Sequence, residues 1–233
     1  MKQDKAAFSL VELLVGIVVI AVLASLVLAA ALRMGASSRN AECLSRLRQV
    51  GGALFRFAND HNGKIPGRAF QAEGESAPIV WHRILVSAGY VQAVTSPPGD
   101  GTPSSPIFYC PSFYPKGPAV SIHAHMRYGM RVWAPPGKLS SDTELLPLSA
   151  IAVPSGFFLV ADSYYTARKS QGYQITHGSR DWTVDLRHSG TSNTLFADGH
   201  IEAKGADYFE SLPLYQGQYG AGRGHLPFHT HQP

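Results

Sequence analysis

The residues with the most promising chemistry lie in the stretch RHSGTSNTLFADGH, where His188, Asn193 and Asp198 could meet beside one hairpin. Carboxylate and amide oxygens suit a hard cation such as Ca²⁺, whereas a histidine nitrogen favours zinc. The alternative is structural, because an Asp in a turn bonds its own backbone and a nearby His can donate to that carboxylate. We expect the structural role without a cofactor, and keep a Ca²⁺ site at these three residues as the alternative.

Other histidines and carboxylates lack the partners that catalysis needs. The His-x-His pairs at 123–125 and 229–231 have no Glu general base at a suitable spacing. The sequence also contains no HExxH, GxSxG or glycine-rich phosphate loop. Asp162 and Asp185 have no identifiable partner with which to form a hydrolytic carboxylate pair. The sequence therefore predicts that the protein is not an enzyme.

Cys43 and Cys110 are the only cysteines, and they stand far apart in the sequence. They form neither a CxxC redox pair nor the spacing of a thiolate zinc site, so we expect neither. A single disulfide between them is an alternative if this part of the chain faces an oxidising compartment.

The composition of the 233 residues indicates one globular domain and one apolar segment, because 45% are hydrophobic and 15% are charged. The formal net charge of +4 is scattered, without a Lys/Arg stripe interleaved with aromatic residues. Nucleic acid is therefore not an expected partner.

The apolar segment contains an uncharged stretch at 13–32, which as a helix spans roughly 30 Å, the thickness of a bilayer core. It could be a plain anchor that keeps Lys2 and Lys5 on the cytoplasmic side, or a long secretory signal cleaved at the alanines of 29–31. Neither interpretation accounts well for Glu12, because a carboxylate near lipid costs a few kcal/mol unless it is neutralised or paired.

A cut between Ala7 and Phe8 would give Glu12 a countercharge. Phe8 then becomes the first residue, and its α-ammonium can pair with Glu12 of the same chain or of a neighbouring subunit. A pair between subunits would set their axial register in lipid. We favour this third interpretation over the other two.

The segment KAAFSLVELLVGIVVIAVLA resembles the start of the prepilin family, which includes type IV pilins and type II secretion pseudopilins. The matching positions are Phe8, Leu10, Val11, Glu12, Leu13, Leu14 and Val15. The resemblance implies that a membrane aspartyl prepilin peptidase cuts before Phe8 and methylates its amine. It also implies that Glu12 pairs with the N-terminus of an adjacent subunit during assembly. Ala7 departs from the glycine that the family prefers before the cut, but alanine is small enough for processing.

A second resemblance lies in the spacing from His188 to Asp198-Gly199, which is similar to the H-x9-DG signature of a bacterial subclass of prepilin-like proteins. The stretches FYCPS, RYGM and LVAD, and a helix around Trp81 after NGKIP, also fit that subclass. Together the two resemblances cover most of the chain.

Local patterns predict an α+β fold. A helix should continue from the apolar segment to about Asn59, with one apolar stripe at three-and-four spacing. The stripe consists of Leu44, Leu47, Val50, Leu54 and Phe57 or Ala58. A short helix is expected at 79–91, and Asp198-Gly199 marks a hairpin turn. Strands are expected at 107–110, 126–133, 157–165, 173–177 and 193–203. A mostly antiparallel sheet should pack on the long helix, as in pilins.

We therefore expect a leader at 1–7, a transmembrane and assembly helix at 8–32, and a head at 33–233 with an irregular tail from about 216. The expected protein is a structural subunit of a type IV pilus or type II secretion pseudopilus. It would cross the bacterial inner membrane once, with its head in the periplasm, or outside the cell once assembled.

The expected partners are the prepilin peptidase, other pilin-like subunits in a homo- or hetero-filament, the inner-membrane assembly machinery and membrane lipid. The alternative is an envelope binding module or a zinc-dependent enzyme that uses a pilin-type anchor.

Overall fold

The computed structural model describes residues 10–70, 79–94, 105–113, 127–132, 145–176, 181–212 and 228–229. The chain divides into two compact units, with the boundary between Arg39 and Asn40.

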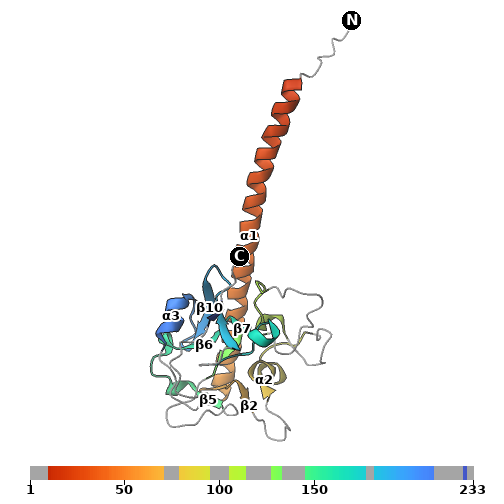
Figure 1. The fold of residues 1–233 in the computed structure, drawn as a ribbon. Helices are drawn as coiled ribbons and strands as arrows, with labels where there is room; N and C mark the ends of the chain where they lie inside the picture. The colour runs from red at the N-terminus through yellow and green to blue at the C-terminus, as the bar shows by residue number, and fades with distance from the viewer. Residues whose placement is uncertain are drawn as a thin grey trace. The chain divides into compact units, whose positions relative to one another are not determined.

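Helix α1 comprises Leu10–Asp60 (Figure 1), so its end confirms the predicted stop near Asn59. Asn62 and Gly63 adopt φ of +54° and +73°, which reverses the chain. The Gly63 N–H then donates to the Ala58 carbonyl over 2.8 Å and satisfies one of the last helical acceptors.

The described strands of the unit that begins at Asn40 form four small sheets. The largest is five-stranded, in the order β11 (Ile201–Gly205), β10 (Thr191–Phe196), β6 (Phe158–Ala161), β4 (Gly129–Arg131) and β8 (Gln174–Ile175). A three-stranded sheet has the order β12 (Phe228–His229), β9 (Trp182–Asp185) and β7 (Ser163–Tyr165). The two-stranded sheets pair β1 (Lys64–Pro66) with β5 (Leu145–Pro147), and β2 (Ala69–Phe70) with β3 (Ile79–Val80).

Most of these pairs are antiparallel, which confirms the α+β class with a largely antiparallel sheet. The described exceptions are β4 with β8 and β12 with β9, which are parallel. The predicted hairpin is confirmed as β10 and β11, with Leu195 opposite Ile201. Gly199 has φ of +93°, the conformation that the turn was expected to need.

Several local predictions are wrong. Residues 107–110 are not a strand, because Pro106 starts a 3₁₀ turn, η1 (Pro106–Phe108). The expected helix at 79–91 is shorter, since α2 covers Trp81–Ser87 and the two residues before it are β3. The run 157–165 is two strands in different sheets, separated at Asp162.

The remaining short elements are η2 (Leu148–Ala150), η3 (Pro154–Gly156), η4 (Thr166–Arg168) and α3 (Ala206–Ser211). The strand predictions at 126–133 and 173–177 hold only at β4 and β8. Their outer residues 126, 133 and 177 lie outside the described residues. The tail from 216 was expected to be irregular; its described part is the strand β12, and the rest lies outside the described residues.

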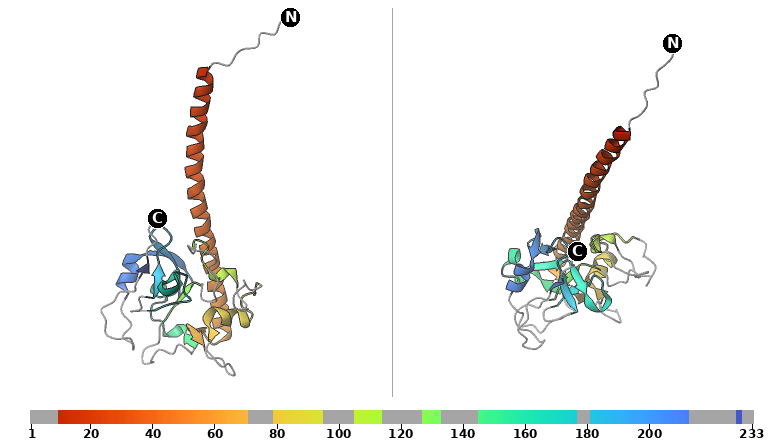
Figure 2. Two further views of the ribbon diagram at one scale, coloured as in Figure 1. Left: turned by 45° about the vertical axis from the view of Figure 1, so that its right-hand side comes forward. Right: turned by 45° about the horizontal axis from the view of Figure 1, so that its top comes forward.

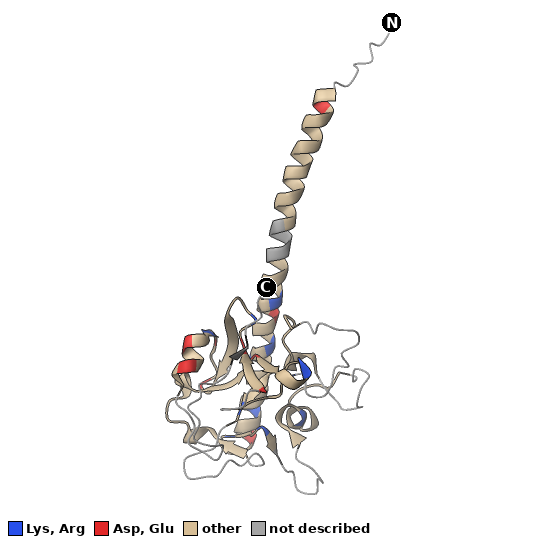
Figure 3. Cartoon of the chain, in the orientation of Figure 1, with Lys and Arg blue, Asp and Glu red and all other residues tan. Residues whose placement is uncertain are grey.

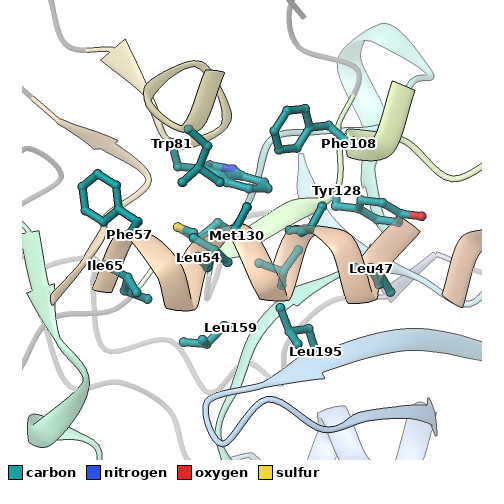
Figure 4. Packing of buried hydrophobic residues seen from close by; sticks show 14 of the residues in the cluster. Leu47, Leu54, Phe57, Ile65, Trp81, Phe108, Tyr128, Met130, Leu159 and Leu195 are labelled. Atoms are coloured by element: carbon teal, nitrogen blue, oxygen red, sulfur yellow. The ribbon is translucent and has the colours of Figure 1, made fainter. Parts of the chain in front are cut away.

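The core of this unit surrounds the part of α1 after Asn40, which lies between α2 and the five-stranded sheet (Figures 2 and 4). Trp81 packs on this helix from α2, and Leu159 and Leu195 pack on it from β6 and β10. The buried stripe on the helix consists of Cys43, Leu47, Val50, Ala53, Leu54, Phe57 and Ala58. It therefore begins at Cys43 and not, as predicted, at half-buried Leu44. This shift by one residue places the thiol of Cys43 in the core.

Candidate functional site

The apolar part of α1 is the first candidate region. Leu10–Leu28 has a mean hydropathy of 2.9 over 19 residues, and it is the one described helix long and apolar enough to cross a membrane. Its large side chains are exposed, for example Ile20 at 67%. Glu12 is the only charged residue in this stretch and lies in the first helical turn. Figure 3 shows the stretch otherwise without charge. Ala7 and Phe8, the predicted processing residues, lie outside the described residues.

The second candidate region is a buried polar cluster in the other unit. Cys43, Cys110, Asp162 and His188 each direct one potential ligand atom into it, and these four atoms lie within 4.8 Å of one another. The residues come from α1, the turn after η1, the break between β6 and β7, and the turn between β9 and β10. The cluster therefore joins four segments that are far apart in the sequence.

The two cysteines are held by different means. Cys43 lies on the buried stripe of α1, so the helix position alone turns it inward. Cys110 is fixed by Gln171, whose side-chain oxygen accepts from the Cys110 N–H over 3.2 Å. The Gln171 amide also donates to the Cys110 carbonyl over 3.0 Å. Both thiols are free and buried.

Asp162 lies where two sheets meet. Its N–H donates to the Asn193 carbonyl of β10, and its carbonyl accepts from the Asp185 N–H of β9 over 2.9 Å. The Asn193 N–H in turn donates to Oδ2 of Asp162 over 3.0 Å. These bonds explain why the strand breaks here and why a fully buried carboxylate keeps one orientation.

His188 is positioned by a two-residue turn. Ser189 and Gly190 have φ of +53° and +82°, as a type I′ turn requires at both central positions. The backbones of His188 and Thr191 exchange hydrogen bonds of 3.0 and 3.1 Å across this turn. The serine and glycine therefore set the direction of the imidazole.

The side chains in the cluster touch directly. His188 Nε2 lies 3.1 Å from Asp162 Oδ2 and 3.3 Å from Cys110 Sγ. Cys43 Sγ lies 3.8 Å from the other carboxylate oxygen, Oδ1. The Tyr128 hydroxyl donates to Cys43 Sγ over 3.1 Å.

A buried guanidinium borders the cluster. Arg187 Nη2 lies 2.7 Å from Asp185 Oδ2, and its Nε lies 3.9 Å from Asp162 Oδ1. These contacts give Asp162 and Asp185 the partners that the sequence did not reveal. The two carboxylates therefore share one guanidinium.

Burial and neighbours shift the pKa values of the cluster. Burial raises the pKa of the Cys43 thiol. Burial acts in the same direction on Cys110, but hydrogen bonds with Cys43 and His188 outweigh it and lower the pKa to about 6. Burial lowers the pKa of His188, but its bonds to Asp162 and Cys110 raise it to about 9. Burial alone would raise the pKa of Asp162, and the charge of Arg187 reverses this and lowers it.

The three residues predicted from the sequence do not form one set. His188 lies in the cluster, but the Asn193 side chain donates to Asn40 Oδ1 over 2.8 Å. Asp198 lies at the hairpin turn, where Oδ1 accepts from the His200 N–H over 3.1 Å and contacts its Nδ1 at 2.5 Å. Asn193 reaches the cluster only through its backbone, and Asp198 is not one of its members.

Sequence reasoning missed Cys43, Cys110 and Asp162 as members of this site. The expectation of no thiolate zinc site rested on sequence spacing alone, whereas tertiary structure brings the two cysteines together with His188. One signal was available, since Cys43 extends the three-and-four spacing of the helix stripe. The structure does not describe the side chains of the His-x-His pairs at 123–125 and 229–231.

Comparisons with known proteins address the N-terminal region only. Residues 2–28 match the model of the family described as the prokaryotic N-terminal methylation motif. This match includes Ala7, Phe8 and Glu12 and supports a prepilin-type protein. Neither the curated proteins nor the solved structures give a significant match.

Proposed function

We propose that the chain is a prepilin-type filament subunit, cut before Phe8, methylated there and held in the bacterial inner membrane by residues 8–32. One observation carries the proposal: an apolar helix of membrane-spanning length has a single acidic residue in its first turn, inside a matched N-terminal methylation motif. The filament would be a type IV pilus or a type II secretion pseudopilus.

The position of Glu12 supports assembly through this helix. A carboxylate in lipid costs a few kcal/mol unless it is neutralised or paired. Processing at Phe8 creates an ammonium that can come from a neighbouring subunit. The resulting ion pair forms only when the two helices are in one axial register, so the cost of leaving Glu12 in lipid selects that register.

The proposal assigns the partners. The prepilin peptidase removes residues 1–7 and methylates Phe8, and the inner-membrane assembly machinery adds the subunit to homologous or identical neighbours. The exposed apolar side chains of Leu10–Leu28 contact lipid before assembly and other helices afterwards. The head lies in the periplasm, or outside the cell in an assembled pilus. The H-x9-DG spacing at His188 and Asp198 is the second resemblance that favours such a head.

Intact mass and N-terminal sequencing of the protein from its native membrane test the processing step. We expect a chain that begins at N-methylated Phe8. A chain that begins at Met1 contradicts the proposal and favours a membrane-anchored head that acts alone. A chain that begins after 29–31 identifies a cleaved secretory signal.

Glu12→Gln tests the assembly step. Processing before Phe8 should continue, because the cleaved bond does not involve residue 12. The yield of filaments should fall strongly. Glu42→Gln is the matched control: it makes the same change on the same helix, where Glu42 is exposed and pairs with Arg46. The control should form filaments at the wild-type level. Equal filament yields from both variants would contradict the role of Glu12.

A further inference from the structure

We propose that Cys43, Cys110, Asp162 and His188 form a structural zinc site in the head. The proposal concerns the unit that begins at Asn40 and does not depend on processing or filament assembly. The site differs from the Ca²⁺ site that the sequence left as an alternative at His188, Asn193 and Asp198, because two of its four donors are sulfur atoms.

The spacing of the donor atoms fits one tetrahedral ion. With zinc–sulfur bonds near 2.3 Å and zinc–nitrogen or zinc–oxygen bonds near 2.0 Å, the edges of such a tetrahedron are roughly 3.3–3.8 Å. Cys110 Sγ lies 3.3 Å from His188 Nε2, which lies 3.1 Å from Asp162 Oδ2. Cys43 Sγ lies 3.8 Å from the other oxygen of the same carboxylate, Oδ1. All four donor atoms lie within 4.8 Å of one another. Small side-chain shifts are enough to place them around a shared ion.

The chemistry of the donors selects the metal. Thiolate sulfur and imidazole nitrogen prefer zinc, whereas Ca²⁺ and Mg²⁺ take oxygen ligands. Four protein donors complete the coordination of zinc and leave no position for water or substrate. The site is therefore structural, and it would tie α1 to the sheets and to the turn after η1.

Hydrogen bonds already orient three of the donors. Tyr128 donates to Cys43 Sγ, the Asn193 N–H donates to Asp162 Oδ2, and Gln171 fixes the backbone of Cys110. Such second-layer contacts are typical of metal sites and tune their affinity. Without an ion, these buried groups would be joined partly through thiol hydrogen bonds, which are weak.

The charges around the cluster also accommodate a divalent ion. As zinc binds, the protons that remain on the two cysteines and on His188 are released to solvent, so binding requires no oxidant or reductant. Two thiolates and the Asp162 carboxylate then surround the ion. Arg187, 3.9 Å from Asp162 Oδ1, offsets part of the excess negative charge.

The test uses the full chain, extracted in detergent under reducing conditions and without chelator. Elemental analysis should find one zinc per chain. After removal with a chelator, added Co²⁺ should produce the visible absorption of a tetrahedral site together with sulfur-to-cobalt charge transfer in the near ultraviolet. This spectrum requires no variant, so it still tests the proposal if substitutions in the cluster impair folding.

Asp162→Asn and His188→Gln should weaken zinc affinity by more than about 100-fold, because losing a second-layer contact alone costs 10–100-fold. Asp198→Asn and His200→Gln make the same chemical changes in the exposed pair on the hairpin and should leave zinc content at one per chain. Tyr128→Phe removes only the hydroxyl on Cys43 and should weaken binding by about 10-fold.

Three results would overturn the proposal. The first is wild-type protein that binds neither zinc nor Co²⁺ stoichiometrically. The second is Co²⁺ binding without sulfur-to-cobalt absorption, which excludes the cysteines as ligands. The third, measured on protein extracted without reductant, is a chain lighter by two hydrogen atoms, with Cys43 bonded to Cys110 and no zinc, which identifies the pair as a disulfide.

Discussion

Arg187 and Asp185 form an ion pair in the interior of the head, with 2.7 Å between Nη2 and Oδ2 and with side chains only 2% and 0% exposed. Asp162 lies on the same guanidinium at 3.9 Å. One buried cation therefore serves two buried carboxylates from the β6–β7 break and from β9. Charged side chains are costly to bury without a partner of opposite charge. The head can therefore bury these two carboxylates only because Arg187 is buried beside them.

Arg187→Met should lower the free energy of unfolding by about 3–5 kcal/mol, because Asp185 loses the guanidinium and Asp162 keeps only its ion pair with His188, while both carboxylates stay buried. Urea unfolding of the detergent-solubilised chain, followed by tryptophan fluorescence, measures this. Lys204→Met is the control, since Lys204 pairs with exposed Glu202 and should contribute less than about 1 kcal/mol. Similar losses from the two variants would show that burial does not determine the effect.

Two glycine substitutions should change stability in opposite directions. Gly199 has φ of +93°, and a Cβ there would lie 3.2 Å from the Phe55 ring. Gly199→Ala should therefore destabilise the head by about 1–2 kcal/mol. Gly52 is helical and exposed, and a Cβ there meets nothing within 4 Å. Gly52→Ala should stabilise it by about 0.5–1 kcal/mol.

Urea midpoints of both glycine variants, compared with wild type, check these signs. A stabilising Gly199→Ala would contradict the positive-φ turn between β10 and β11. A destabilising Gly52→Ala would contradict an exposed position within α1.

The stability of the hairpin turn should depend on pH through Asp198. Burial acts to raise the pKa of Asp198, but hydrogen bonds with His200 outweigh it and hold the pKa below its ordinary value. Because the folded pKa is depressed, the stabilisation is present above the unfolded value of about 3.9 and is lost as the pH falls through the folded value. The side chain is 36% exposed, so the effect is small.

Urea midpoints of wild type and Asp198→Asn, taken stepwise from about pH 7 towards pH 3, measure this effect. The wild type should be the more stable protein at neutral pH, and the difference should shrink on acidification. A difference independent of pH would assign the role of Asp198 to turn geometry alone.

The features that the sequence predicts well are those with local causes. The three-and-four spacing from Leu47 to Phe57 requires only one helix face, and the Asp198-Gly199 turn requires only one backbone conformation. Pro106, in contrast, converts an apolar run into a 3₁₀ turn, which hydrophobicity alone does not reveal. Local rules thus located α1 and the β10–β11 hairpin.

The cysteine cluster has no local cause. Cys43 and Asp162 are 119 positions apart, and their contact depends on the break at Asp162 between two strands of different sheets. The break at Asp162 follows from backbone hydrogen bonds to Asn193 and Asp185, which belong to strands later in the sequence. No spacing rule predicts such a site, so of its four members the sequence indicates only His188.

The indole of Trp81 offers a final test of the core. Its Nε1 donates to the Tyr173 carbonyl over 2.8 Å, and its ring meets Phe108 edge-on at 5.5 Å. Trp81→Phe removes the donor, leaves the carbonyl without that bond and opens a small cavity. We expect a loss of about 1–3 kcal/mol in the free energy of unfolding.

Trp182→Phe is the matched control for this substitution, because Trp182 is only half-buried and stacks on Tyr165 at 3.9 Å, an arrangement that Phe can retain. Circular dichroism should follow unfolding here, since each substitution removes a fluorophore. Trp81→Phe should lower the urea midpoint more than Trp182→Phe does. The reverse order would mean that the packing of α2 on α1 contributes less to stability than the contacts of Trp182 between β9 and β7.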